Sequence, residues 1–288
     1  MTTRRDFIKQ SSLLTAAFFV SKEEFFLKQK KIGVQLYTLR DTIGKDPKGV
    51  LKQVASLGYK QVETFGYNNG KWFGLTPSEL GAVLKENGLT SPSGHTFGGA
   101  TFLVDGWEEK WKQAVTDSKA LGQEYIVVPY LEDKGRTPEN YKKIAAALNK
   151  AGEICKASGS KLAYHNHDFE FADNGGQTGL EILTSGTDAK LVSFELDIYW
   201  ASKAGHDPIA LFKKYPGRFS MWHIKDMDKT DKKFFTEVGN GVIDWKPIFG
   251  YEKLSGMKYF FVEQDVCPGP PIESIAKSFD YLKKNIVK

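Results

Sequence analysis

The chain is predicted to fold as a single (β/α)8 barrel, in which eight parallel strands alternate with helices. Short apolar runs alternate regularly with helical patterns, and the alternation gives eight strand candidates between residues 31 and 288. Eight such units fit a closed barrel better than an open doubly wound sheet. No G-x-G-x-x-G pattern follows the first candidate, so the dinucleotide-binding alternative lacks its signature.

The strand candidates are short apolar runs bounded by turn or helix signals. They are residues 32–37, 61–65, 89–94, 125–129, 162–166, 191–196, 219–224 and 259–263. Two of the helices between them have clear starts: Thr76 precedes Pro77 and lies three residues before Glu79, and Thr137 precedes Pro138. Both threonines are predicted to cap a helix whose first residue is proline. Glycines are expected to end five helical patterns, at Gly58, Gly88, Gly122, Gly159 and Gly256.

Residues 1–30 are predicted to be a leader, which leaves residues 31–288 for the barrel. The run from Thr3 to Lys9 contains Arg4 and Arg5 and is followed by apolar residues 13–20, so it resembles a twin-arginine export signal. The expected location is therefore periplasmic. The apolar run is shorter than the ~20 residues of a membrane span, so no stable membrane anchor is expected. No A-x-A site follows at residues 21–24, which leaves cleavage of the leader open.

The charge distribution argues against nucleic-acid binding. The formal net charge is +5, but the first 31 residues carry seven Lys or Arg against three Asp or Glu, so residues 32–288 carry only +1. A near-neutral body provides no electrostatic surface for DNA or RNA. The two cysteines, Cys155 and Cys267, are too few for a disulfide framework and are expected to serve packing and loop roles. The oligomeric state is left undetermined.

Titratable side chains gather where the predicted strands end, which is where a barrel places its active site. They are Glu63, His95, Tyr130 and Glu132, His165 and His167, Asp197, His223 with Lys225 and Asp226, and Glu263. Singly, each has an ordinary structural explanation, such as a helix cap, a core histidine or a surface ion pair. His165 and His167 are one residue apart, so on a strand they share a face. Together, imidazoles and carboxylates converging from neighbouring strands favour a divalent metal site.

Several segments resemble the sugar phosphate isomerase/epimerase family of xylose-isomerase-like barrels, which also includes inosose and dehydroshikimate dehydratases and, distantly, endonuclease IV. They are residues 32–37, 61–63, 197–200, 223–226, 239–245 and 262–265. The resemblance implies a metal held by a carboxylate from strand five, Asp197, His223 and Glu263. Two departures stand out: His165 replaces the strand-five carboxylate, and Trp200 stands where many members have histidine. We therefore expect His165, Asp197, His223 and Glu263 to bind Mn²⁺, Mg²⁺, Co²⁺ or Zn²⁺.

The resemblance implies proton abstraction next to a carbonyl of a sugar or polyol, through a metal-stabilised enediolate, as in an isomerase or epimerase. Candidate bases are Glu263, His167 and Glu63. The expected substrate contacts are His95, Trp200, Lys225 and Tyr130, and aromatic side chains near the strand ends (Trp72, Phe97, Trp107 and Trp200) either stack on a sugar or only pack. One alternative is a dehydratase or lyase acting on a keto-sugar or 3-keto-glycoside. The other is a carbohydrate-binding barrel without catalysis.

Overall fold

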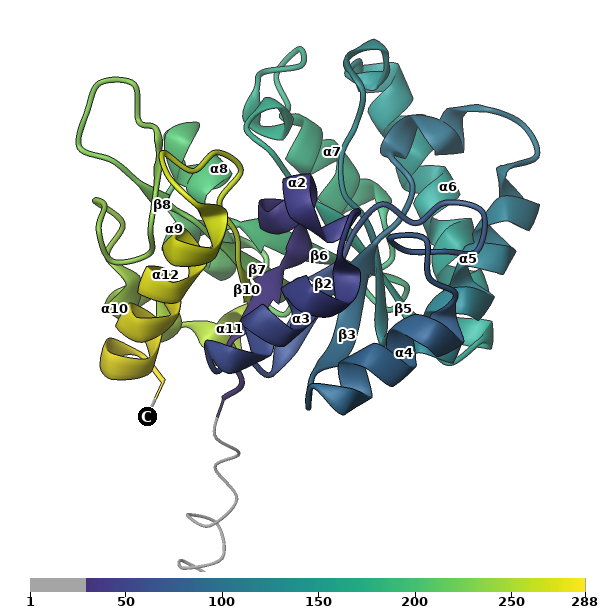
Figure 1. The fold of residues 1–288 in the computed structure, drawn as a ribbon. Helices are drawn as coiled ribbons and strands as arrows, with labels where there is room; N and C mark the ends of the chain where they lie inside the picture. Colours follow the sequence, from purple (N-terminus) through teal and green to yellow (C-terminus); the bar gives the residue numbers. More distant parts are fainter. Residues whose placement is uncertain (1–29, 288) are drawn as a thin grey trace, which may run out of the picture.

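The computed structural model describes residues 30–287, in which eight parallel strands close into a barrel (Figure 1). The strands follow one another around the barrel in the order β1-β10-β7-β6-β5-β4-β3-β2. They are β1 (Gly33–Gln35), β2 (Gln61–Thr64), β3 (Thr90–His95), β4 (Tyr125–Val128), β5 (Lys161–His165), β6 (Val192–Asp197), β7 (Phe219–Ile224) and β10 (Tyr259–Val262). All eight strand predictions and the fold class are confirmed. The predicted leader lies outside the described residues, apart from Lys30.

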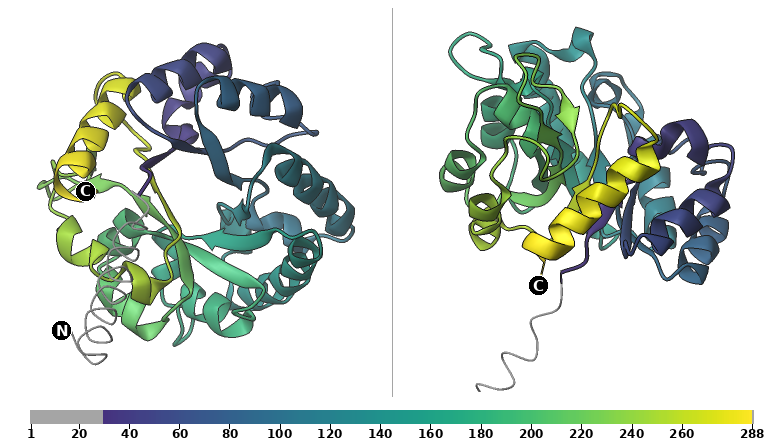
Figure 2. Two further views of the ribbon diagram at one scale, coloured as in Figure 1. Left: turned by 90° about the horizontal axis from the view of Figure 1, so that it is seen from below. Right: turned by 60° about the vertical axis from the view of Figure 1, so that its left-hand side comes forward.

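Helices form a ring around the strands, which is clearest along the barrel axis (Figure 2). They are α2 (Arg40–Ile43), α3 (Pro47–Ser56), α4 (Pro77–Glu86), α5 (Trp107–Leu121), α6 (Pro138–Ala157), α7 (Gly179–Gly186), α8 (Ile198–Lys203), α9 (Pro208–Lys214), α10 (Trp245–Phe249), α11 (Glu252–Ser255) and α12 (Pro271–Asn285). Four 3₁₀ turns lie at Leu36–Leu39, Gly99–Leu103, Asp133–Gly135 and Phe169–Phe171. A small antiparallel pair, β8 (Asp226–Met227) and β9 (Phe235–Thr236), extends the loop after β7.

The helix boundaries follow the predicted capping chemistry. The Thr76 hydroxyl accepts a hydrogen bond from the Glu79 backbone N–H, and the Glu79 carboxylate accepts one from Thr76, which completes a capping box at α4. The Thr137 hydroxyl likewise caps α6. Gly122 ends α5 at φ 91°, a left-handed conformation that glycine adopts without steric cost.

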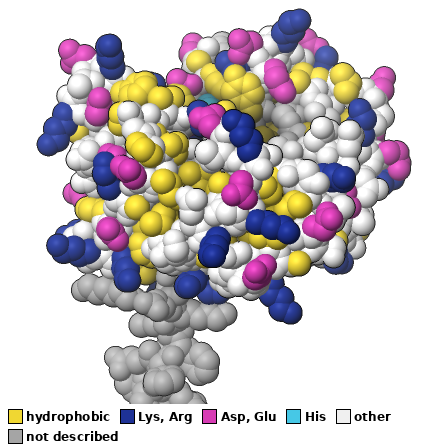
Figure 3. All heavy atoms as spheres, viewed as in Figure 1, with side chains coloured by type: hydrophobic (Ala, Val, Ile, Leu, Met, Phe, Trp, Pro, Cys, Tyr) yellow, Lys and Arg dark blue, Asp and Glu magenta, His cyan; other side chains and the backbone are white. Residues whose placement is uncertain are grey.

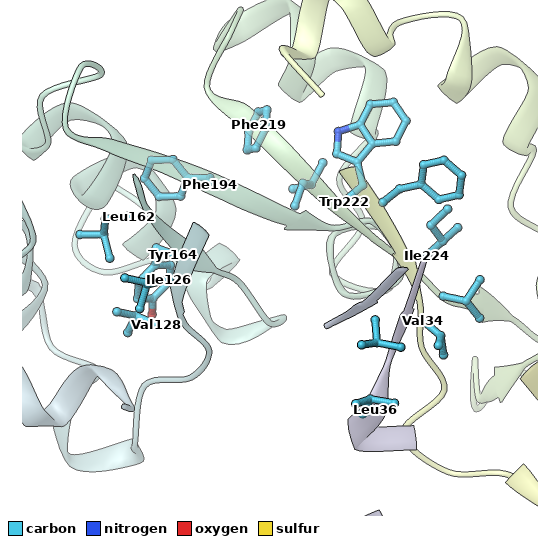
Figure 4. Packing of buried hydrophobic residues seen from close by; sticks show 14 of the residues in the cluster. Val34, Leu36, Ile126, Val128, Leu162, Tyr164, Phe194, Phe219, Trp222 and Ile224 are labelled. Carbon is cyan, nitrogen blue, oxygen red and sulfur yellow. The ribbon is translucent and has the colours of Figure 1, made fainter. Parts of the chain in front are cut away.

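Apolar side chains fill two separate layers. Outward-facing strand residues such as Val34, Ile126 and Trp222 pack beneath the helices (Figure 4). Inward-facing residues form a second cluster inside the barrel: Tyr125, Val127, Ala163, Met221 and Phe261. The two layers arise because successive strand residues point to opposite faces.

Asp226 organises the long loop after β7. Its carboxylate accepts hydrogen bonds from the backbone N–H groups of Met227, Gly239 and Ile243 and from the indole N–H of Trp245. Asp226 is fully buried, so it is not part of an exposed ion pair with Lys225. These bonds fix the backbone next to the end of β7 and hence the position of Lys225.

No helix among residues 30–287 is both long and apolar enough to cross a membrane. On the face shown in Figure 3, basic and acidic side chains are interspersed.

Candidate metal centre and active site

Three of the four predicted metal ligands meet at the carboxyl-terminal ends of the strands. Asp197, His223 and Glu263 are buried, and each offers a ligand atom within 4.8 Å of the others. Asp197 and His223 are register partners on β6 and β7, and Glu263 follows β10 directly. The fourth residue, His165, approaches from β5 with its Nε2 3.7 Å from Asp197 Oδ2. The barrel therefore brings the predicted set to one place.

Lys225 lies among the carboxylates of this cluster. Its ammonium nitrogen is 2.6 Å from Glu263 Oε2, 2.7 Å from Asp265 Oδ2 and 2.9 Å from Asp197 Oδ2. Lys225 and Asp197 are almost fully buried, and the Asp265 side chain is 21% exposed. Three carboxylates thus face one ammonium, which leaves two negative charges uncompensated by the lysine.

The donor set fits a divalent cation. Asp197 Oδ2 is buried and makes no hydrogen bond within the described residues, although the Lys225 ammonium is close. Lys225 supplies one positive charge to three carboxylates, so a divalent cation would compensate the negative charge that remains. Mixed imidazole and carboxylate ligands suit Zn²⁺, Mn²⁺ and Co²⁺. Asp197, His223 and Glu263 would hold the ion, with His165 beside them.

A second group of buried polar side chains lies next to the first. His223 reaches both groups, because its Nδ1 is 2.8 Å from Glu263 Oε2 and its Nε2 is 2.6 Å from Glu63 Oε2. Glu63 also accepts hydrogen bonds from Gln35 and Ser93 and is fully buried. With both oxygens occupied, the Glu63 carboxylate is positioned to hold His223. The prediction that Glu63 acts as a base remains untested, but its surroundings favour this supporting role.

Glu195 is the main site residue that the sequence analysis missed. It is fully buried on β6, and its Oε2 lies 2.9 Å from His95 Nε2 and 3.1 Å from His165 Nδ1. His95, His165, Glu195 and His223 form a second group whose ligand atoms all lie within 4.8 Å of one another. A usable signal was present: Glu195 precedes Asp197 by two residues, so on a strand both must face the barrel interior.

The buried carboxyl groups differ in pKa because their neighbours differ. Burial raises the pKa of Asp197 to about 6, although Lys225 and His223 act in the opposite direction. Burial also acts to raise the pKa of Glu263, but Lys225 and then His223 outweigh it and hold that pKa well below its usual range. Burial, together with the neighbouring Glu63, raises the pKa of Glu195. Glu263 is therefore ionised at neutral pH.

His167 has the surroundings of a proton-transfer group. Burial, and then Lys225, lower the pKa of His167 well below its usual value, so the imidazole is neutral at neutral pH. Its Nδ1 has no hydrogen-bond partner among the described residues. The ring stacks on Phe169 with centroids 5.5 Å apart, and it meets the Tyr130 ring at 88° with centroids 5.1 Å apart. A neutral, held and unpartnered imidazole can accept a proton.

A cavity of about 470 Å³ opens beside these residues. Three predicted substrate contacts, His95, Tyr130 and Lys225, line it, as do His165, His167 and Glu263. Tyr37 and Phe65 form a further aromatic part of the wall, which the sequence analysis did not identify. The two rings meet edge to face, with their centroids 5.2 Å apart.

The tryptophans that were predicted to contact substrate do not line this cavity. Trp200 is not among the residues that line this cavity and packs against His167, Tyr199 and Phe235 instead. Trp72 is fully buried and Trp107 is 7% exposed, both within the core, so the suggestion that these two stack on a sugar is wrong. The Trp72 ring packs against Tyr67, and the Trp107 ring packs against Phe102.

Fold and site together define a closed α/β barrel with a buried imidazole and carboxylate centre at the carboxyl-terminal ends of its strands. A profile described as the xylose isomerase-like TIM barrel matches residues 51–285. The chain therefore belongs to the xylose isomerase-like TIM barrel family.

Two curated relatives carry the same name. An inosose dehydratase of Clostridium tetani is 31% identical over 178 residues, which are 54% of this chain and 58% of the relative. The matched part is thus little more than half of that relative's length. An inosose dehydratase of Geobacillus kaustophilus is 27% identical over 273 residues, which are 81% of this chain and 83% of the relative.

Among solved structures, a sugar phosphate isomerase/epimerase from Parabacteroides distasonis is similar over most of the chain. It superposes with a TM-score of 0.79 at 27% identity, covering 90% of this chain and 100% of that one. The relatives thus include both a dehydratase and a protein described as an isomerase or epimerase.

Proposed function

We propose that this protein is a divalent-metal-dependent enzyme that removes the proton next to a carbonyl group of a sugar or cyclic polyol. The observation that carries the proposal is the meeting of Asp197, His223 and Glu263, whose buried carboxylates share one lysine, beside a cavity lined by a neutral His167. The curated relatives add support because their name describes dehydration of an inosose.

The roles of the residues follow from their positions. A divalent ion held by Asp197, His223 and Glu263 would polarise the substrate carbonyl and stabilise the charge that develops on its oxygen. His167 takes the adjacent proton on a ring nitrogen, and its contacts with Phe169 and Tyr130 hold the ring in place. Tyr37 and Phe65 provide an apolar wall for one face of a sugar ring.

Dehydration is the outcome that the site favours. After proton removal, the electrons of the broken C–H bond form a carbon–carbon double bond and expel a hydroxyl from the next carbon. That hydroxyl leaves as water once it has been protonated, so no oxidant or reductant is needed. Two-base epimerisation would need a second base, and the strand-five carboxylate implied by the family resemblance is here His165, whose Nδ1 contacts Glu195.

Isomerisation or epimerisation is the second candidate, because the structural relative covering 90% of this chain is described as an isomerase/epimerase. Dehydration and isomerisation or epimerisation begin with the same proton removal. They differ in the next step, which is loss of a hydroxyl in dehydration and reprotonation in the other two. The reaction outcome therefore has to be read from the product.

The test is proton exchange and product analysis in D₂O. The purified protein, loaded with Mn²⁺ or Co²⁺, is incubated with a panel of inososes, keto-sugars and 3-keto-glycosides and followed by ¹H NMR. We expect loss of the proton next to the carbonyl together with an unsaturated, dehydrated product. A deuterated isomer instead would support the second candidate. A protein that binds no divalent ion and exchanges no proton would contradict both, and would favour a barrel that only binds carbohydrate.

A further inference from the structure

The strand-five ligand position carries an imidazole in this chain, and a buried carboxylate lies directly next to it. His165 and Glu195 are register partners on β5 and β6, and His165 Nδ1 lies 3.1 Å from Glu195 Oε2. The side chains are 2% and 0% exposed. The pair is therefore buried inside the barrel.

We propose that His165 and Glu195 act as one unit that takes the place of the single strand-five carboxylate implied by the family resemblance. Glu195 is a positioning residue: it accepts the Nδ1–H of His165 and thereby presents Nε2 to the metal position. The inference rests on the metal-dependent function proposed above and adds a residue that acts through a ligand.

The contact decides which ring nitrogen is free. A Glu195 oxygen that accepts a hydrogen bond from Nδ1 fixes the proton of a neutral His165 on that nitrogen. Nε2 then keeps its lone pair, and it lies 3.7 Å from Asp197 Oδ2. Metal-binding histidines commonly donate their second N–H to a carboxylate in this way, which fixes the ring and makes it a stronger ligand.

The charge of the site supports the same pairing. Replacing a ligand carboxylate by a neutral imidazole removes one negative charge from the metal site. An ionised Glu195 would return that charge one hydrogen bond further out. No lysine or arginine contacts it among the described residues; its Oε2 faces ring nitrogens of His95, His165 and His223, and its Oε1 has no partner there. Packing alone would favour an apolar residue here, because a buried carboxylate is costly.

A second cation between the imidazoles and Glu195 would be an alternative use of the same atoms. It would need His165 Nδ1 and His223 Nε2, yet His223 Nε2 is already 2.6 Å from Glu63 Oε2. With one ion at Asp197 and Glu263 and a second ion at Glu195, His165 and His223 would each bind an ion through both ring nitrogens. An imidazole can do this only when it has lost its remaining N–H proton. The hydrogen-bonded arrangement needs no such deprotonation.

The experiment is a double-mutant cycle read by metal binding, without substrate. The full chain, its Glu195→Gln and His165→Glu variants and the double variant are stripped of metal. Each is titrated with Mn²⁺ by EPR, metal stoichiometry is measured by mass spectrometry, and folding is checked by circular dichroism. Glu237→Gln is the control, because Glu237 is a buried glutamate that contacts Ser274 and Lys277 on α12 instead.

We expect Glu195→Gln to weaken Mn²⁺ binding by about 10- to 100-fold. His165→Glu should also weaken it, because it places two buried carboxylates together. The double variant restores the charge count, since the amide introduced at position 195 can donate to the carboxylate introduced at position 165, and it should bind more tightly than either single variant. Glu237→Gln should bind like the original protein.

The alternative results are distinguishable. If the original protein binds one ion tightly and Glu195→Gln binds it equally well, the inference fails while the proposed function stands. A double variant that binds more weakly than both single variants would also overturn the inference, as would two ions per chain. If the original protein binds no divalent ion, the proposed function itself fails and the inference fails with it.

Discussion

The buried Glu170 should make the stability of this protein depend on pH, and Glu170→Gln should remove that dependence. Glu170 is fully buried and accepts hydrogen bonds from the Tyr164 hydroxyl and from the His167 backbone N–H. Burial raises the pKa of Glu170 from 4.5 to about 7, although these hydrogen bonds act to lower it. Between those two values the folded chain binds more protons at this site than the unfolded chain.

The sign and size follow from proton linkage. Because the folded state holds the extra proton, the contribution of Glu170 to the free energy of unfolding falls as pH rises from 4.5 to 7. At 1.36 kcal/mol per pKa unit, the loss is about 3 kcal/mol at pH 7 and above. Glutamine mimics the protonated acid: its oxygen accepts the His167 N–H and its amide donates to the Tyr164 oxygen. For a chain of this length, 3 kcal/mol corresponds to roughly 5 °C in Tm.

The assay is thermal unfolding, followed by circular dichroism, at pH 5 and pH 8. We expect Glu170→Gln to melt within about 1 °C of the original protein at pH 5 and about 5 °C above it at pH 8. Glu153→Gln changes an exposed residue of α6 and is the control, with a small effect of the same size at both pH values. Equal Tm differences for Glu170→Gln at pH 5 and pH 8 would refute the reasoning.

Three further predictions concern function. His167→Gln should lower kcat by about 10²-fold or more, while its Mn²⁺ affinity stays within a few-fold of the original. Glu263→Gln should mainly weaken Mn²⁺ binding. The reverse pattern would assign the base to Glu263. Chelation of the ion should lower stability by about 2.7 kcal/mol relative to protein at 100 times the Kd, so an unchanged Tm after treatment with EDTA would count against the metal centre. Arg4→Lys with Arg5→Lys should leave the full chain in the cytoplasm, measured by cell fractionation; continued periplasmic delivery would argue against the export signal.

The amino-acid sequence by itself determined the fold class and the outline of the site. The alternation of apolar runs with capped helical patterns is a local signal, because strand and helix periods and capping residues act within a few positions of the chain. The barrel then requires the strand ends to meet at one edge, so Asp197, His223 and Glu263 were brought together as predicted.

Only the tertiary structure decided which residue contacts which and therefore which role each one can have. Glu63 looked like a base at a strand end, but Gln35, Ser93 and His223, which lie far apart in the sequence, occupy its carboxylate. Trp72 stood near a strand end but is fully buried in packing. Glu195 was overlooked because, in a sequence, a carboxylate within an apolar strand gives no sign of its partners. The register of β5 against β6 places it opposite His165, and such pairing depends on contacts across the barrel that no local pattern encodes.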